Sequence, residues 1–234
     1  MRSRSGAVVV AVAALIVVCL SSALVSRSTP QVEDIVVQDW TAQPLGSTGV
    51  PVGWSAYETF GGRPRYDFAV VEDDGRRALD LRSRDDHSTI VKKIHVDLRT
   101  TPILEWSWKM VALPAGADIR KKSTSDLSGH IFVVWPRLGM LRARLIGYAW
   151  GTAEPAPSVE RSRKTGAVTF FVLRSGPKDL HRWMNERRNV YADYRTAFGE
   201  DPDDARAVAL SIDTNDTHST AEALIGRIAF TAGQ

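Results

Sequence analysis

Strict alternation of apolar and polar residues is the dominant pattern in this chain, and residues 103–111 show it most clearly. Successive side chains of a β-strand point to opposite faces of the sheet, so a period of two indicates a strand with one buried face. Polar Glu105, Ser107 and Lys109 occupy one face of this strand. The residues on the other face are all large and apolar: Leu104, Trp106, Trp108 and Met110.

Similar short runs recur along the chain, separated by clusters of Gly, Pro, Asp and Asn that are typical of turns. About ten short strands without helices between them predict a mostly-β fold, an antiparallel β-sandwich or jelly roll, because parallel sheets need helical crossovers. The predicted strands cover residues 35–40, 66–71, 78–83, 89–96, 103–111, 130–135, 144–150, 168–173, 207–213 and 223–230.

One segment, residues 178–198, departs from this alternation. Its large side chains recur at helical spacing and fall within about one third of a helix circumference. Pro177 suits the start of a helix and Gly199 suits its end. We therefore expect a single amphipathic helix that lies on the sandwich or closes one end of it. Its stripe comprises Leu180, Trp183, Arg187, Val190, Tyr191, Tyr194 and Phe198.

The N-terminus has the features of an export signal. Arg2 and Arg4 form a basic start, and residues 6–25 follow without a charge. Small side chains at Ser21 and Ala23 suit cleavage after Ala23. The apolar stretch is also long enough to span a hydrocarbon core of about 30 Å, so a retained single anchor is the alternative. Either way we expect an exported, periplasmic or extracytoplasmic protein, which contacts the membrane through this segment if it is uncleaved.

These features divide the chain into a leader at residues 1–25, a linker at 26–33 and a single β-sandwich domain at 34–234. The only cysteine, Cys19, lies in the leader, so the domain has no disulfide, thiolate metal site or cysteine nucleophile. Arg2 and Arg4 belong to the 30 basic residues, and the others nearly balance the 27 acidic ones. A near-neutral domain argues against nucleic-acid binding, which needs a concentrated basic face.

Several stretches together resemble a known family. They are "LEWSWKM", "LPAGADIRKKSTSDLSGHIFVVW", "LIGYAW", "MNERRNVYADYRTAFGEDP" and "VALSIDTNDTHSTAEALIGRIAF". The chain resembles the bacterial domain-of-unknown-function family numbered 3047 over residues 35–230, most specifically at 186–199. The resemblance implies an exported envelope protein with a jelly-roll β-sandwich of the carbohydrate-binding-module type. It supplies no catalytic residue.

Arg187 is the most unusual residue of the predicted helix, because it lies in the middle of the apolar stripe. Arginine is rarely buried without a partner, and its planar guanidinium suits a carboxylate. Either it pairs with an aspartate and pins the helix to the sheet, or it faces an anionic ligand such as a sugar acid. The candidate aspartates are Asp126, Asp213 and Asp216. The candidate ligand-binding residues are Arg187, Asn189, Tyr191, Tyr194 and Trp150.

A cluster near the C-terminus offers a possible calcium site. Asp213, Asn215 and Asp216 place three oxygen ligands within a short segment. Calcium takes about six to eight oxygen ligands, but the full loop signature of a calcium hand is missing. Asp and Asn are also favoured turn residues. A turn is therefore the main interpretation, calcium is the alternative, and no other cofactor or metal is expected.

Motifs for catalysis are absent from the sequence. The five histidines are scattered, and no nucleophile elbow, phosphate loop or dinucleotide fingerprint occurs. A glycosidase needs only two carboxylates, which meet through the fold, so an enzyme is not excluded. The leading hypothesis is a non-catalytic module that binds a glycan or similar polar envelope ligand. The alternatives are a carbohydrate-active hydrolase or lyase, and a structural envelope protein that binds another protein.

Overall fold

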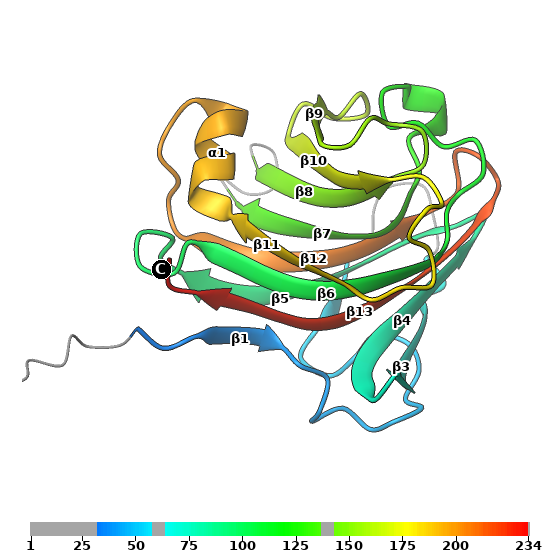
Figure 1. Cartoon of the computed structure of the whole chain (residues 1–234), viewed down its shortest axis with the longest axis horizontal. Coiled ribbons are helices and arrows are strands. Elements are labelled where there is room, and N and C mark those ends of the chain that lie inside the picture. The colour runs from blue at the N-terminus through cyan, green and yellow to red at the C-terminus, as the bar shows by residue number, and fades with distance from the viewer. Residues whose placement is uncertain (1–31, 58–63, 137–142, 234) are drawn as a thin grey trace, which may run out of the picture. The chain divides into compact units, whose positions relative to one another are not determined.

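The chain folds into two β-sheets that share one core. A computed structural model describes residues 32–57, 64–136 and 143–233 (Figure 1). The predicted leader, its cleavage position, Cys19 and most of the predicted linker lie outside the described residues. Val32–Gln234 belong to one compact unit. No helix in the described part of the chain has the length and apolar character needed to cross a membrane.

The first sheet is organised around β13 (Thr220–Thr231). Strand β6 (Ile103–Ala112) lies along one side of β13. The two halves of the other side pair with β4 and β1. All pairs in this sheet are antiparallel, and its remaining strands are β1 (Ile35–Gln38), β3 (Asp67–Asp73), β4 (Arg76–Arg84) and β11 (Met184–Asn189).

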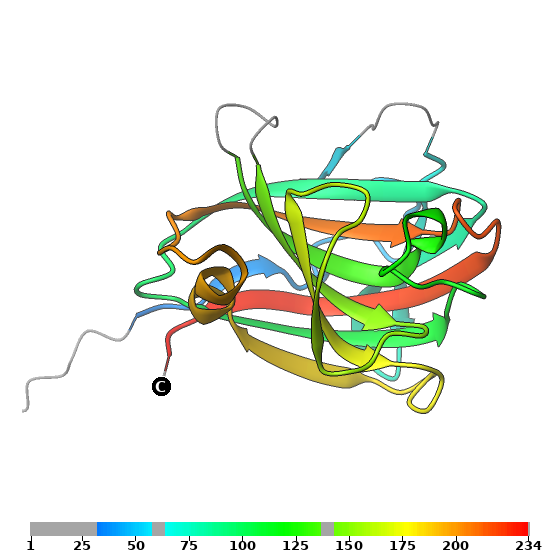
Figure 2. The same ribbon diagram turned by 90° about the horizontal axis from the view of Figure 1, so that it is seen from above.

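The second sheet has the strand order β2-β5-β12-β7-β8-β10-β9 (Figure 2). Strand β10 lies between β8 and β9. It runs parallel to β8 and antiparallel to β9. Among the described strands, β8 and β10 form the one parallel pair, and all other pairs are antiparallel. The strands are β2 (Ser55–Ala56), β5 (His87–Val96), β7 (Leu127–Trp135), β8 (Arg144–Gly151), β9 (Ser158–Arg161), β10 (Val168–Ser175) and β12 (Ala205–Asp213), and a short 3-10 helix covers Lys122–Thr124.

Large aromatic side chains fill the space between the sheets. The ring centroid of Trp106 on β6 lies 5.1 Å from that of Tyr148 on β8, and the Trp108 and Trp150 centroids are 6.0 Å apart. All four side chains are buried. Trp106 and Trp108 therefore pack in the core, as the alternation in residues 103–111 predicted.

The predicted strands are all present, with ends shifted by at most a few residues. Sequence reasoning missed β2, β9 and β11. The first two are too short to show a period. The third has the sequence MNERRN, in which polar residues occupy both faces, so it carries no apolar alternation.

The helix predicted over residues 178–198 is correct only at its C-terminal end. Helix α1 covers Val190–Phe198, and the preceding segment forms turns and then β11. Asn189 caps the helix by accepting the backbone N–H of Ala192 at 2.9 Å. Gly199 ends it with a φ of 72°, as predicted. The early part is a strand because β6 would otherwise leave one edge unpaired.

Helix α1 closes one end of the sandwich (Figure 1). The Tyr194 ring contacts Trp135 of β7, with centroids 4.6 Å apart. Asp193 lies on the same helix and accepts hydrogen bonds from the buried hydroxyl of Tyr148, at 2.8 Å, and from Nε of Arg188, at 2.9 Å. The helix is thus joined to both sheets by packing and by a buried polar network.

Candidate functional site

Several residues predicted to bind ligand have structural roles instead. Trp150 and Tyr194 are buried, so the prediction that they contact a ligand is corrected. The indole N–H of Trp150 donates to the backbone carbonyl of Gly176 at 3.0 Å, and the Tyr194 hydroxyl accepts from Arg144 at 2.9 Å. Asn189 caps α1, and Tyr191 lies half-buried on the same helix. Only Arg187 of this set lines a groove.

The predicted calcium ligands do not converge on one point. Asp213 and Asp216 lie 3.6 and 2.5 Å from Nζ of Lys164, whereas Asn215 is exposed. A lysine ammonium thus occupies the position between these two carboxylates. Burial raises the pKa of Asp213 to about 7, an effect that the charge of Lys164 opposes. Within the described residues, no three His, Cys, Asp or Glu side chains are arranged to hold a metal ion.

Arg187 pairs with a residue that was not among the candidate aspartates. Its Nε lies 3.0 Å from Oε1 of Glu105, on the outer face of β11 and β6. The Arg187 side chain is 53% exposed and that of Glu105 is 37% exposed. The prediction of a buried arginine in a helical stripe is therefore wrong, because residue 187 belongs to an edge strand and points to solvent.

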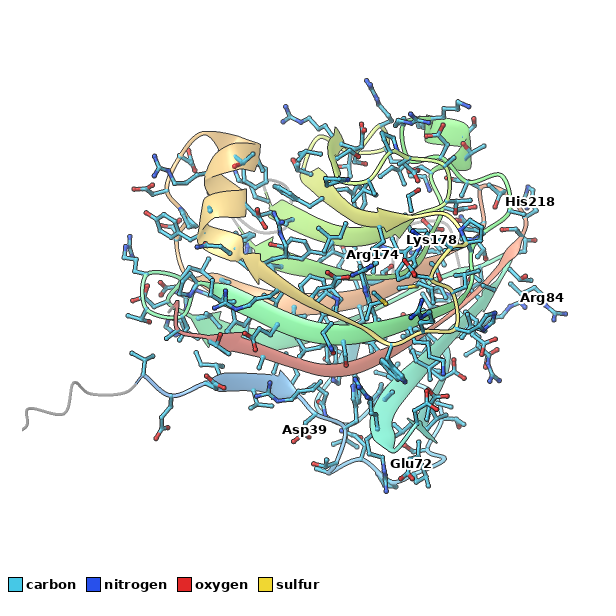
Figure 3. The ribbon with its side chains drawn as sticks, viewed as in Figure 1. Asp39, Glu72, Arg84, Arg174, Lys178 and His218 are labelled. Carbon is cyan, nitrogen blue, oxygen red and sulfur yellow. The ribbon has the colours of Figure 1, made fainter. Side chains whose placement is uncertain are left out.

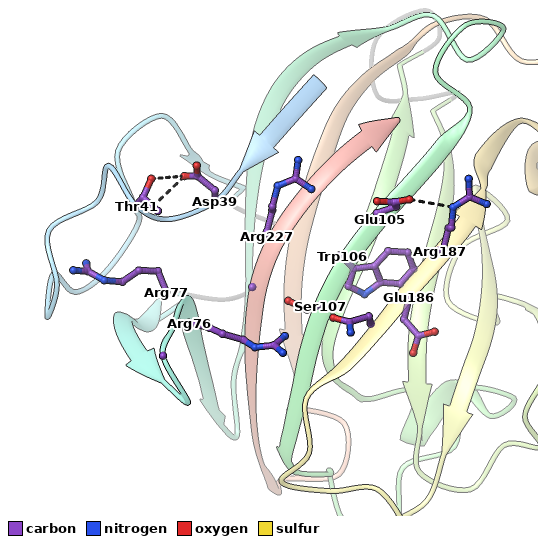
Figure 4. A pocket seen from close by; sticks show the side chains of 13 residues that line it. Asp39, Thr41, Arg76, Arg77, Glu105, Trp106, Ser107, Glu186, Arg187 and Arg227 are labelled. Carbon is purple, nitrogen blue, oxygen red and sulfur yellow. Dashed lines mark hydrogen bonds and ion pairs between the residues drawn. The ribbon is translucent and has the colours of Figure 1, made fainter. Parts of the chain in front are cut away.

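A groove crosses the outer face of the first sheet (Figure 4). Its volume is about 860 Å³, and its walls come from β4, β6, β11, β13 and the segment after β1. We call it the charged groove. The lining residues are Asp39, Thr41, Gly75, Arg76, Arg77, Glu105, Trp106, Ser107, Asn185, Glu186, Arg187, Gly226 and Arg227.

The floor of the charged groove requires a glycine. A Cβ atom at Gly226 would lie only 2.2 Å from Oγ of Ser107 and 3.4 Å from the Trp183 ring. Gly226 also falls where the pairing of β13 with β6 shifts register between Ile225 and Ile228. The carbonyl of Gly226 accepts the indole N–H of Trp40 at 2.9 Å. The missing side chain keeps the floor low and lets Trp183 pack close to the sheet.

Arg76, in the lining of the charged groove, stacks on Trp183. The guanidinium carbon of Arg76 lies 5.4 Å from the ring centroid. The indole N–H of Trp183 donates to Asp73 at 2.7 Å, and Nζ of Lys109 donates to the same carboxylate at 2.6 Å. The Lys109 hydrogen bond lowers the pKa of Asp73, so this carboxylate stays charged. The stack is thus held in a defined position at the turn between β3 and β4.

The charges around the groove are mostly paired. Asp39 accepts hydrogen bonds from the backbone N–H and the hydroxyl of Thr41, at 3.1 and 3.0 Å (Figure 4). Glu186 accepts a hydrogen bond from Nε of Arg174 at 2.5 Å, and Arg174 lies near the end of β10 (Figure 3). Arg76 differs, because it has no carboxylate partner among the described residues. The N–H groups of Arg76 are therefore among the hydrogen-bond donors that line the groove.

Sequence reasoning found Arg187 but missed the rest of this groove. Arg76 follows Asp73, Asp74 and Gly75, which are typical turn residues, but it precedes the strand predicted at residues 78–83. Trp183 was placed in the helical stripe. Gly226 lies inside a strand pattern, where a glycine indicates a bulge or a close approach. The sequence does not show that Ser107 and Trp183 are the residues that approach it.

The two stacked sheets place the chain in the β-sandwich class. A family model described as "Protein of unknown function (DUF3047)" matches residues 52–229, so the chain belongs to this family. This confirms the resemblance found in the sequence. Comparison with curated proteins gave no match.

Solved structures with a similar arrangement have low sequence identity. The family 30 carbohydrate-binding module of a Clostridium thermocellum cellulosomal cellulase has 11% identity and a TM-score of 0.42, covering 87% of this chain and 99% of that module. The xyloglucanase domain of NopAA from Sinorhizobium fredii has 9% identity and a TM-score of 0.44, covering 82% and 100%. A carbohydrate-binding module specific for non-crystalline cellulose has 12% identity and a TM-score of 0.39, covering 87% and 94%.

Proposed function

We propose that this chain is a non-catalytic module that binds a glycan in the charged groove. The observation that carries the proposal is an open volume of about 860 Å³ lined by planar hydrogen-bonding side chains over a floor of Gly226 and Ser107. Guanidinium and amide groups present paired donors that match neighbouring hydroxyls of a sugar. Ligand pockets for drug-sized molecules measure about 300–1,000 Å³, so this groove has room for a short oligosaccharide.

The state of the carboxylates supports binding over hydrolysis. Hydrolysis of a glycosidic bond needs two carboxyl groups, one of which donates a proton. Asp39 is held by Thr41, Glu105 pairs with Arg187, and Glu186 accepts from Arg174 and Trp108. Each groove carboxylate that the structure describes is thus engaged as an acceptor. This arrangement suits fixed hydrogen bonding of hydroxyl groups.

Export is also part of the proposal. It is supported by the basic start at Arg2 and Arg4 and by the uncharged residues 6–25. The mass of the protein recovered from cells tests it. A chain that begins at residue 24 indicates a cleaved signal, and a full-length chain in the membrane fraction indicates an anchor. A full-length chain in the soluble cytoplasmic fraction would contradict export.

Binding to a broad glycan panel tests the main proposal. The purified chain is expected to retain at least one glycan class, and Arg76→Ala is expected to weaken that binding by about tenfold, typical for the loss of a charged hydrogen bond. Arg195→Ala is the matched control, because Arg195 lies on α1, is exposed and pairs with the exposed Asp201. Release of new reducing ends would instead favour the hydrolase. No binding to any glycan would overturn the proposal.

A further inference from the structure

The outer face of the second sheet carries a groove of a different character. Alternation on β12 turns Val208 and Leu210 inward, so Ala207 and Ala209 point outward. Solvent-facing positions of an antiparallel sheet are ordinarily polar. Here a groove of about 690 Å³ is lined mainly by apolar side chains. We call it the apolar groove, and its largest apolar residues are Val91, Ile94, Phe132, Val134, Leu145 and Val168.

Strand register explains why this face is hollowed along β12. Ala209 pairs with Val91 of β5 on one side and with Phe132 of β7 on the other. Ala207 pairs in the same way with Lys93 and Val134. A row of small residues thus runs along β12 between two rows of larger ones (Figure 2 shows the strand order). The result is a trough about one side chain wide.

The charge around the apolar groove has one sign. Lys93 and Arg206 are the charged residues among its described lining residues, and no Asp or Glu lines it there. Arg206 makes a 3.6 Å contact with Asp204, but His95 already holds that carboxylate at 2.6 Å. Lys93 has no ion-pair partner within the described ranges. Two cations at the same end of the trough, next to Ala207, favour an anionic group there.

We propose that the apolar groove binds one acyl chain with an anionic head group, taken from solution as a single amphiphile. The chain lies over Ala207 and Ala209, and the head group faces Lys93 and Arg206. A trough one side chain wide fits a single chain, whereas a bilayer surface would need a broad, raised apolar face. This site is separate from the charged groove, which lies on the other sheet.

Binding of a chain-length series of fatty acids to the purified chain tests the proposal. The affinity of each fatty acid is measured by displacement of a fluorescent fatty acid. It is expected to increase from octanoate to palmitate, because each buried methylene raises affinity about three- to fourfold. Lys93→Glu is expected to weaken palmitate binding by at least about tenfold, and it leaves the fold unchanged because Lys93 is exposed. Hexadecyltrimethylammonium, with the same chain and the opposite charge, is expected to bind more weakly than palmitate.

Filling the trough separates this site from nonspecific adsorption. Ala209→Leu is expected to abolish palmitate binding, and circular dichroism confirms that the variant is folded. Val159→Leu, at an exposed position on β9, is the control and should bind as the original chain does. The proposal would be overturned if Lys93→Glu and Ala209→Leu both bound palmitate as tightly as the original protein. Adhesion to phosphatidylglycerol vesicles without binding of monomeric fatty acid would also overturn it, since that result would identify a membrane-docking surface.

Discussion

The two outer faces of this sandwich share a core but carry opposite chemistry. The charged groove on the first sheet exposes guanidinium, carboxylate and amide groups above Gly226. The apolar groove on the second sheet exposes aliphatic side chains above Ala207 and Ala209, with Lys93 as a cation at its end. Both lie over small residues, which lower the sheet surface and create the volume.

This difference shows how a β-sandwich separates stability from binding. Inward positions are large and apolar on both sheets, as with Trp106 on β6 and Tyr148 on β8. Outward positions contribute little to the core, so their chemistry can change without changing the fold. The two faces are therefore expected to bind independently of each other and to depend on one shared core.

The largest effect is expected at the shared core. Trp108→Ala removes a fully buried ring that contacts Trp106 and Trp150 from opposite sheets. The free energy of unfolding is expected to fall by about 3–5 kcal/mol, measured by urea denaturation. Binding at both grooves should be lost together as the protein unfolds. A loss below about 1 kcal/mol, or loss of binding on only one face, would contradict a common core.

The half-buried Asp213 and the buried His130, on the outward side of the second sheet, are expected to have opposite effects on stability. Burial raises the pKa of Asp213 to about 7, so its contribution is complete at low pH and is lost as pH rises through about 7. Burial lowers the pKa of His130 to about 4, so its contribution is complete above about pH 6.5 and is lost as pH falls through about 4. Between these limits the two effects oppose each other.

Asp213→Asn removes one of these effects. Stability of the variant is then expected to rise between pH 4.5 and 6.5 more steeply than that of the original chain, by up to about 1.4 kcal/mol per pH unit. Urea denaturation at several pH values measures the slopes. Asp201→Asn, at an exposed position, is the control and should leave the slope unchanged. Parallel profiles for the original chain and Asp213→Asn would show that the carboxyl group does not titrate as inferred.

A matched pair of glycine substitutions addresses the two faces separately. A Cβ at Gly226 would lie 2.2 Å from Oγ of Ser107, and one at Gly147 would lie 2.5 Å from a ring carbon of Phe170 and 2.9 Å from one of Phe132. Each alanine variant is expected to cost about 1–3 kcal/mol through overpacking. Gly226→Ala should weaken glycan binding and spare palmitate binding, and Gly147→Ala should do the reverse. If either variant weakened both glycan binding and palmitate binding, the two faces would be coupled.

The sequence predicted the framework better than the site, for a physical reason. Alternation reports which residues are buried, so residues 103–111 and the other predicted strands were placed correctly. The charged groove depends on contacts between distant segments, such as Trp183 with Asp73 across 110 residues. Helical spacing in residues 178–198 was misleading because β11 forms to cover the edge of β6, which no local pattern shows. Arg187 became a candidate binding residue because the predicted helix would have buried it, whereas its side chain is exposed.

The smallest effect on stability is expected for Arg187→Met. The Arg187–Glu105 pair lies on the surface, with 53% and 37% of the two side chains exposed, and such pairs contribute about 0.2–1 kcal/mol. Unfolding free energy should therefore change by no more than about 0.5 kcal/mol, whereas glycan binding should weaken because a groove donor is lost. A double-mutant cycle with Glu105→Gln measures the pair itself. If stability fell by about 2 kcal/mol with binding intact, Arg187 would be a structural tie between β11 and β6, and the charged groove would lose one of its proposed contacts.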